Sequence, residues 1–292
     1  MYVFHRLLLN DVKPLINGIG TSEVEEVTFV RGSNTVHLID TPGFNDSTRS
    51  DVDVLDDITE WLADSYKEKI LLSGIVYLHR ITEPRMSGTA NRDLTMFKNL
   101  CGSHASECIV LATTGWPRGG DDDCEYREGQ LKTKKEYWGD LCRDKSQVMR
   151  LMNTQQSALD IVDYLCQLKK TVKLTIQTEI VDKHLALTET SAANALSREL
   201  TKQIKDFEQA MEGIQGRLEK ALERNDEKLQ LRHEMRMAEM QEKLNSALAD
   251  QKKLADENRR PGFMERVGQK IDNFLDNAWS IWGSRPGFAN WR

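Results

Sequence analysis

An aspartate and a glycine stand three positions apart in HLIDTPGF, residues 37–44. An Asp-x-x-Gly that follows a strand can serve as a nucleotide switch, in which the carboxylate orients a water ligand of Mg²⁺ and the glycine amide reaches a terminal phosphate. Turns use the same residue types, so an ordinary turn is the alternative. The Thr-Pro inside the motif and the helical pattern after it favour the switch interpretation for Asp40 and Gly43.

The elements around this motif predict an α/β fold. A β-rich hairpin is followed by apolar runs of strand length that alternate with amphipathic helical stretches, which is typical of a mostly parallel sheet buried on both faces in a three-layer sandwich. The predicted strands are 24–30, 35–40, 70–81, 108–114 and 148–152, and the predicted helices are 52–66, 90–100 and 157–170.

The second part of the chain has a different pattern. Between about 185 and 258, Gly and Pro nearly vanish and apolar residues recur every three or four positions, which predicts a long helix or coiled coil. The seam consists of Leu200, Ile204, Phe207, Met211, Ile214 and Leu218, weakens from 225 to 236, and resumes at Met240, Leu244 and Leu248. We expect this segment to supply self-association or contact with a protein partner.

A final amphipathic helix and tail are predicted at 262–292, after the helix-ending NRRPG of 258–262. The polar face of this helix carries both acidic and basic side chains, so packing against the domain or a partner is favoured over binding to anionic lipid. Three tryptophans, Trp279, Trp282 and Trp291, keep peripheral membrane contact as the alternative.

Composition limits the functional classes. The 292 residues carry a net charge of −6, which argues against general affinity for nucleic acid. Five cysteines without a Cys-x-x-Cys pair are typical of reduced thiols, and we therefore expect a cytoplasmic protein. Charged residues make up 29% and aromatic residues 7%, which indicates a modest core with a long polar helical portion.

A family resemblance rests on three quoted stretches: LIDTPGFNDSTRSDVDVLDDITEWL, KILLSGIVYLHRITEPRMSGTANRDLTMFKNLCG and SALDIVDYL. Together they resemble the fungal G-domain proteins related to the AIG1-like and septin-like GTPases, over roughly residues 20–170. The resemblance implies a P-loop α/β domain at 1–175 that binds GTP with Mg²⁺. It further implies that Thr21, with Ser22 as the fallback, coordinates the metal together with Asp40, and that Gly43 contacts the nucleotide.

Two departures from the family weaken this expectation. No Gly-x-x-x-x-Gly-Lys-Ser/Thr occurs in the chain, so we expect the first strand and the phosphate-binding loop to be missing. In LATTGWPRGGDDD, Pro117 stands where the family has a base-recognising aspartate, and only Asp121, Asp122 or Asp123 could replace it. Since each lost charge-assisted donor is worth about 1.5–3 kcal/mol, nucleotide binding falls by at least about three decades.

Three hypotheses follow. The first is a GTP-binding protein whose nucleotide gates assembly or partner binding, with GTP hydrolysis left open. The second is a non-catalytic scaffold, in which a degenerate G domain carries a coiled-coil arm. The third is that the phosphate loop is encoded upstream of the given sequence.

Overall fold

The computed structural model describes residues 24–44, 49–83, 88–117, 119 and 121–256. The predicted metal ligand Thr21 and the predicted helix at 262–292 lie outside these residues, and both stay predictions. Five strands and the helices around them account for most of the described chain. The strands are β1 (Glu25–Arg31), β2 (Asn34–Asp40), β3 (Ile75–Arg80), β4 (Ile109–Thr114) and β5 (Gln147–Arg150).

The strands form two sheets. Strands β3, β4 and β5 are parallel and adjacent in that order, with Ile75 opposite Ile109 and Val110 opposite Gln147. Strands β1 and β2 form a separate antiparallel hairpin. Its turn uses Gly32 at φ +60°, a conformation that glycine adopts without steric strain. The predicted α/β class is confirmed, while the sheet consists of two pieces.

Helices follow the predicted order, with several short turns between them. Several helices are capped at their N-termini by side-chain oxygens, as at Ser50, whose Oγ accepts from the Val52 amide at 3.1 Å. The helices are α2 (Asp51–Lys67), α3 (Gly88–Cys101), α4 (Asp122–Thr133), α5 (Asp140–Arg143), α6 (Gln155–Leu168), α7 (Thr175–Gln177), α8 (Ser191–Glu223) and α9 (Glu227–Asp256). The short turns are η1 (Ser103–Cys108), η2 (Lys135–Gly139), η3 (Thr178–Asp182) and η4 (Leu187–Glu189).

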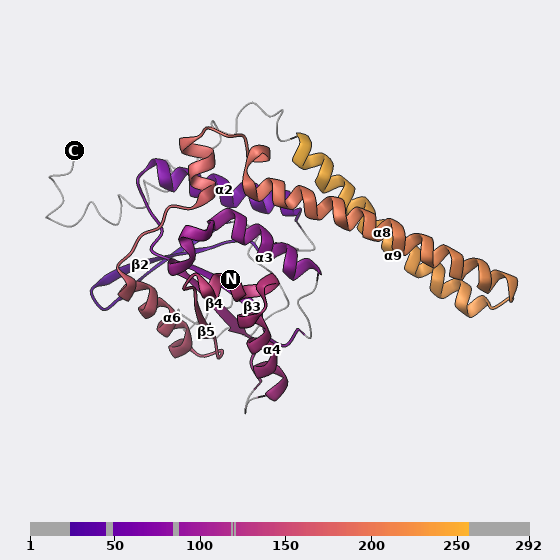
Figure 1. Cartoon of the computed structure of the whole chain (residues 1–292), viewed down its shortest axis with the longest axis horizontal. Helices are drawn as coiled ribbons and strands as arrows, with labels where there is room; N and C mark the ends of the chain where they lie inside the picture. Colours follow the sequence, from indigo (N-terminus) through magenta and orange to yellow (C-terminus); the bar gives the residue numbers. More distant parts are fainter. Residues whose placement is uncertain (1–23, 45–48, 84–87, 118, 120, 257–292) are drawn as a thin grey trace.

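The parallel sheet is covered on both faces because its strands are apolar at successive positions. Ile109 and Leu111 of β4 belong to the main apolar cluster, which contains α2 and α3. Val110 and Ala112 point to the opposite face and pack in a second cluster with α6. The predicted three-layer arrangement is therefore present, with the helices on either side of the strands in Figure 1.

The β1–β2 hairpin is attached to the domain through α6. Phe29, Val36 and Leu38 of the hairpin pack on the cluster that also contains α6. Arg31 donates two hydrogen bonds to Asp163 of α6, at 2.8 and 2.6 Å, in a forked arrangement. One helix therefore holds the hairpin and the parallel sheet together.

The predicted coiled-coil region is an antiparallel helical hairpin, which we call the arm (residues 191–256). Helices α8 and α9 pack along each other and extend from the domain in Figure 1. Between them Asn225 adopts φ +50°, and the Asp226 carboxylate accepts from the Leu229 amide at 3.1 Å and caps α9. The weak part of the predicted seam contains this turn, so the two halves of the seam pair within one chain.

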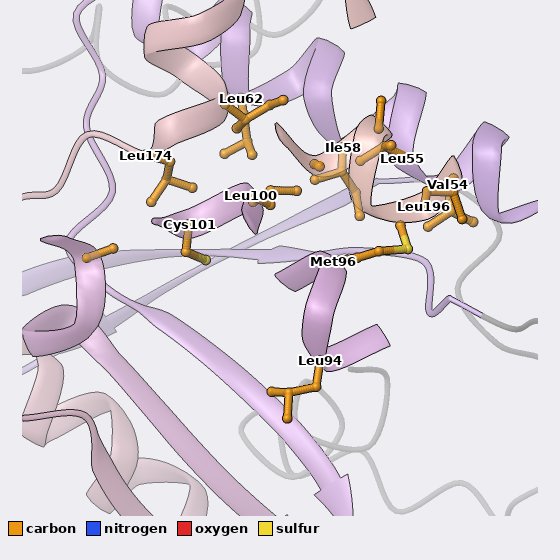
Figure 2. Packing of buried hydrophobic residues seen from close by; sticks show 14 of the residues in the cluster. Val54, Leu55, Ile58, Leu62, Leu94, Met96, Leu100, Cys101, Leu174 and Leu196 are labelled. Carbon is orange, nitrogen blue, oxygen red and sulfur yellow. The ribbon is translucent and has the colours of Figure 1, made fainter. Parts of the chain in front are cut away.

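The base of the arm belongs to the core of the α/β domain. Leu196 and Leu200 of α8 and Leu254 of α9 are buried in the same cluster as Leu55 of α2 and Met96 of α3. Figure 2 shows Leu196 among the side chains of α2 and α3. The arm is thus anchored by apolar packing.

Among the described residues, none of the helices combines the length and apolar content that a membrane span requires.

Removing one anchor tests this arrangement. Leu196→Ala deletes a fully buried side chain at the base of the arm, and we expect it to lower the free energy of unfolding by about 2–5 kcal/mol. Leu231→Ala is the matched control, because Leu231 lies in the same arm but is 60% exposed. The free energy of unfolding of Leu231→Ala should stay within about 0.5 kcal/mol of the wild-type value. Urea denaturation of both full-length variants measures the difference, and equal small effects would contradict a shared core.

Candidate functional site

Asp40 is the last residue of β2 and lies opposite Glu25 in the hairpin. Its side chain is completely buried, and Pro42 is buried two residues later. Because β2 pairs with β1 and not with the described parallel strands, Asp40 does not end a strand of the parallel sheet. The chain then leads through Ser50 into α2, so the motif is directly upstream of a capped helix.

Gly43 is exposed, and an added Cβ would meet nothing within 4 Å. It is absent from the glycines with positive φ. The conformation therefore does not require glycine at this position. Contact between Gly43 and a nucleotide stays a prediction, as does a metal-binding role for Asp40. The predicted metal partner Thr21 is outside the described residues, so the structure does not bring these three residues together.

The carboxyl ends of β4 and β5 form the edge at which open α/β sheets bind ligands. After β4 the chain turns at Gly115, whose φ is +75°, and a Cβ there would lie 3.3 Å from Arg80 Cγ. The next residue, Trp116, donates from Nε1 to Thr113 Oγ1 at 3.0 Å. The Arg150 guanidinium lies 4.1 Å from the centre of the Trp116 ring, a cation–π stack.

Glu128 of α4 holds the other side of Arg150. Arg150 donates to the Glu128 carboxylate through Nε at 3.1 Å and through Nη2 at 2.8 Å. Lys132 donates to the same carboxylate at 3.0 Å and Thr113 Oγ1 at 3.3 Å. Burial alone raises the pKa of Glu128, but these hydrogen bonds outweigh burial and hold the pKa below its ordinary value.

The polar groups at this edge are therefore engaged with one another. Trp116 and Arg150 stack, and Arg150 is bound to Glu128. The described polar groups of this cluster are therefore already paired with one another and not directed at an open base-binding position.

Asp121, Asp122 and Asp123 have a structural role at the start of α4. Asp121 caps α4 by accepting from the Asp123 and Cys124 amides, at 2.9 and 3.3 Å. Asp122 and Asp123 lie in the first helical turn.

The metal site implied by the resemblance is not assembled within the part of the chain that the structure describes. No group of three or more His, Cys, Asp or Glu residues there could hold an ion. His104 lies between Cys101 and Cys108 in the sequence, and its Nε2 is 2.6 Å from the Lys173 carbonyl oxygen. Burial raises the pKa of Cys101, which disfavours the thiolate that a metal needs.

Comparison with known proteins gives a distant structural likeness. No family model matches the chain. No curated protein matches it either. Among solved structures, the chain is similar to Toc33 from Arabidopsis thaliana in complex with Mg²⁺ and GMPPNP, with a TM-score of 0.44 and 13% identity over 59% of this chain and 82% of that chain.

Two further structures are similar to the same degree. A dimerization-deficient mutant of Toc33 gives a TM-score of 0.43 and 14% identity over 59% of this chain and 82% of that chain. Translation elongation factor SelB from Methanococcus maripaludis, in complex with the GTP analogue GppNHp, gives 0.38 and 12% identity over 60% of this chain and 32% of that chain. Scores this low carry no argument about the site.

The Arg150–Glu128 pair generates a pH-dependent prediction. Arg150→Met leaves the buried Glu128 carboxylate with fewer donors, so the free energy of unfolding at pH 7 should fall by about 1–3 kcal/mol. In the wild type the depressed pKa of Glu128 gives stability that is present above the ordinary pKa and is lost as pH falls through the folded value. The deficit of the variant should therefore be smaller at about pH 3 than at pH 7.

Arg143→Met is the control for this experiment, because Arg143 forms an exposed ion pair with Asp140. It should change stability by less than about 1 kcal/mol at either pH. A pH-independent deficit in Arg150→Met, measured by urea denaturation, would show that Glu128 does not depend on Arg150.

Proposed function

We propose that this protein is a GTPase-like α/β domain that has kept little affinity for nucleotide and acts as a scaffold that presents its helical arm to a partner. One observation carries the proposal. The base of the arm is buried in the domain core, while the polar groups at the carboxyl ends of β4 and β5 are bound to one another. The domain thus positions the arm rigidly and offers little to a base.

The GTPase ancestry is supported by the stretch from Leu38 to Leu62 and by its resemblance to the AIG1-like and septin-like families. In an intact member of these families, GTP and Mg²⁺ are held by a phosphate loop whose pattern this sequence lacks. Asp40 is the predicted Mg²⁺ partner that the structure describes, and one carboxylate is a poor site for a hard cation. For the chain as given, we expect weak nucleotide binding and negligible hydrolysis, because its sequence does not contain these donors.

The far end of the arm supports partner binding. Leu222, Leu231 and Met235 are 53%, 60% and 65% exposed, although they lie in helices whose opposite faces are buried. Acidic and basic side chains surround them, including Glu223 and Arg232. A surface of mixed charge with apolar residues matches a second copy of itself better than an anionic membrane or nucleic acid.

Calorimetry with GTP and Mg²⁺ tests the nucleotide part. We expect a dissociation constant weaker than about 10 µM for the chain as given. Asp40→Ala should leave this weak binding unchanged, and ATP with Mg²⁺ serves as the specificity control. Nanomolar binding of GTP that Asp40→Ala abolishes would refute the scaffold proposal and restore the nucleotide-gated one.

Sedimentation velocity tests the arm. We expect a concentration-dependent dimer of the full chain near about 100 µM, a concentration at which weak contacts are populated. The triple variant Leu222→Ser, Leu231→Ser and Met235→Ser should shift it to monomer. Leu248→Ser is the control, because Leu248 is exposed but belongs to the half of α9 nearer the domain. A wild-type monomer at this concentration would remove self-association from the proposal.

A further inference from the structure

The N-terminus of α2 lies next to a buried arginine of α3. Asp51, the first residue of α2, is 4% exposed, and its Oδ2 lies 2.6 Å from Nη2 of Arg92. Arg92 is itself 5% exposed. A guanidinium stays protonated in proteins, so this charge cannot be neutralised by losing a proton. It has to keep its partners when it is withdrawn from water.

The same guanidinium also contacts the arm. Its Nη1 donates to Oε1 of Gln203 in α8 at 3.1 Å. Its Nε lies 3.6 Å from Oδ1 of the neighbouring Asp93. Arg92 therefore joins the start of α2 to the base of α8 through one rigid, planar group.

Helix α9 makes a second connection to the same end of α2. Lys253 forms an ion pair with Asp53, and the hydroxyl of Ser50, the N-cap of α2, is close enough to Asp250 to favour the charged form of that carboxyl and lower its pKa. Gln251, the residue after Asp250, donates from Nε2 to Thr201 Oγ1 at 3.1 Å, and this bond joins α9 to α8. Both helices of the arm are thus attached to residues 50–53.

Carboxylates outnumber cations in this cluster, with Asp51, Asp53, Asp93 and Asp250 facing Arg92 and Lys253. Burial raises the pKa of Asp93 to about 7, although Arg92 opposes the change. Burial also raises the pKa of Asp250, although the nearby Ser50 hydroxyl lowers it. The excess of acid means that each carboxylate depends on the placement of the two cations, so loss of one contact weakens the others.

We infer that the base of the arm and the N-terminus of α2 form one reciprocal clamp, through which residues 50–53 control how firmly the arm is docked. Displacing residues 50–53 removes partners from Arg92 and Lys253 and loosens α8 and α9. Undocking the arm removes Gln203 and Lys253 and loosens the start of α2. Coupling of this kind is equal in both directions. It concerns the chain alone and stands whether or not GTP binds.

Apolar packing is the competing explanation. Leu196, Leu200 and Leu254 could hold the arm without help from the polar cluster. In that case a polar substitution on the arm would loosen only its own surroundings. The two explanations therefore differ in what happens about 150 residues away along the chain, at α2.

Hydrogen exchange of the full chain, read by mass spectrometry, separates them. Gln203→Ala removes the arm's contact with Arg92, and we expect about fivefold faster exchange both in 191–204 and in 51–58. Exchange in β4 should not change, which excludes a global loss of stability. Gln251→Ala is the matched control, because its bond to Thr201 lies within the arm. It should affect the arm without affecting α2.

The reverse direction uses Asp51→Asn, which we expect to speed exchange in 247–254 by about the same factor. Arg92→Lys keeps the charge but loses the planar fork, so its effect at both ends should be in the same direction. If Asp51→Asn fails to fold, Gln203→Ala decides. Faster exchange confined to α8 in Gln203→Ala, or an identical pattern in Gln203→Ala and Gln251→Ala, would overturn the clamp.

Discussion

A positive charge that is almost completely withdrawn from water dictates much of this structure. Arg92 cannot lose its proton, so it must keep Asp51 of α2 and Gln203 of α8 within hydrogen-bonding distance. That requirement fixes where α8 leaves the domain. The apolar cluster shared by α2, α3, α8 and α9 buries the base of the arm, and Arg92 adds polar contacts between these helices. The result is an arm with a defined direction.

The two ends of the molecule present different kinds of side chain. At one end polar groups are paired with each other, and at the other end apolar side chains are exposed. At the carboxyl ends of β4 and β5, Trp116, Arg150 and Glu128 bind one another. The far end of the arm instead exposes Leu222, Leu231 and Met235 to solvent. This contrast supports the proposal that the domain holds the arm in place for a partner.

Much of the fold could be predicted from the sequence because its signals are local. Apolar runs located β4, period-3.6 patterns located α2 and α6, and two adjacent β-rich runs located the hairpin. The turn between α8 and α9 was not predicted, because Asn225 and Asp226 stand among strong helix formers and a periodic pattern averages over them. The seam was right, but its partner is the same chain.

The site was harder to predict, because its contacts join residues far apart in the sequence. Glu128 and Arg150 are 22 positions apart, and this spacing does not correspond to a sequence motif. The available signal for this site was Trp116, which lies in a Gly-rich loop after a buried strand. The sequence does not reveal that Arg150 is the residue that stacks on it. Asp40 was placed correctly at a strand end, although that strand belongs to the hairpin. Thr21 stays a prediction, and Gly43 lies in a conformation that other residues could adopt.

On this account the domain holds the arm in one direction. Pulsed dipolar spectroscopy measures this directly, with spin labels on non-natural amino acids at exposed positions Gln156 of α6 and Lys228 of α9. Labelling through cysteine is avoided because Cys142 and Cys166 are partly accessible. A single narrow distance distribution in the unliganded chain is the predicted result. A broad distribution, as from a helical hairpin on a flexible joint, would contradict it.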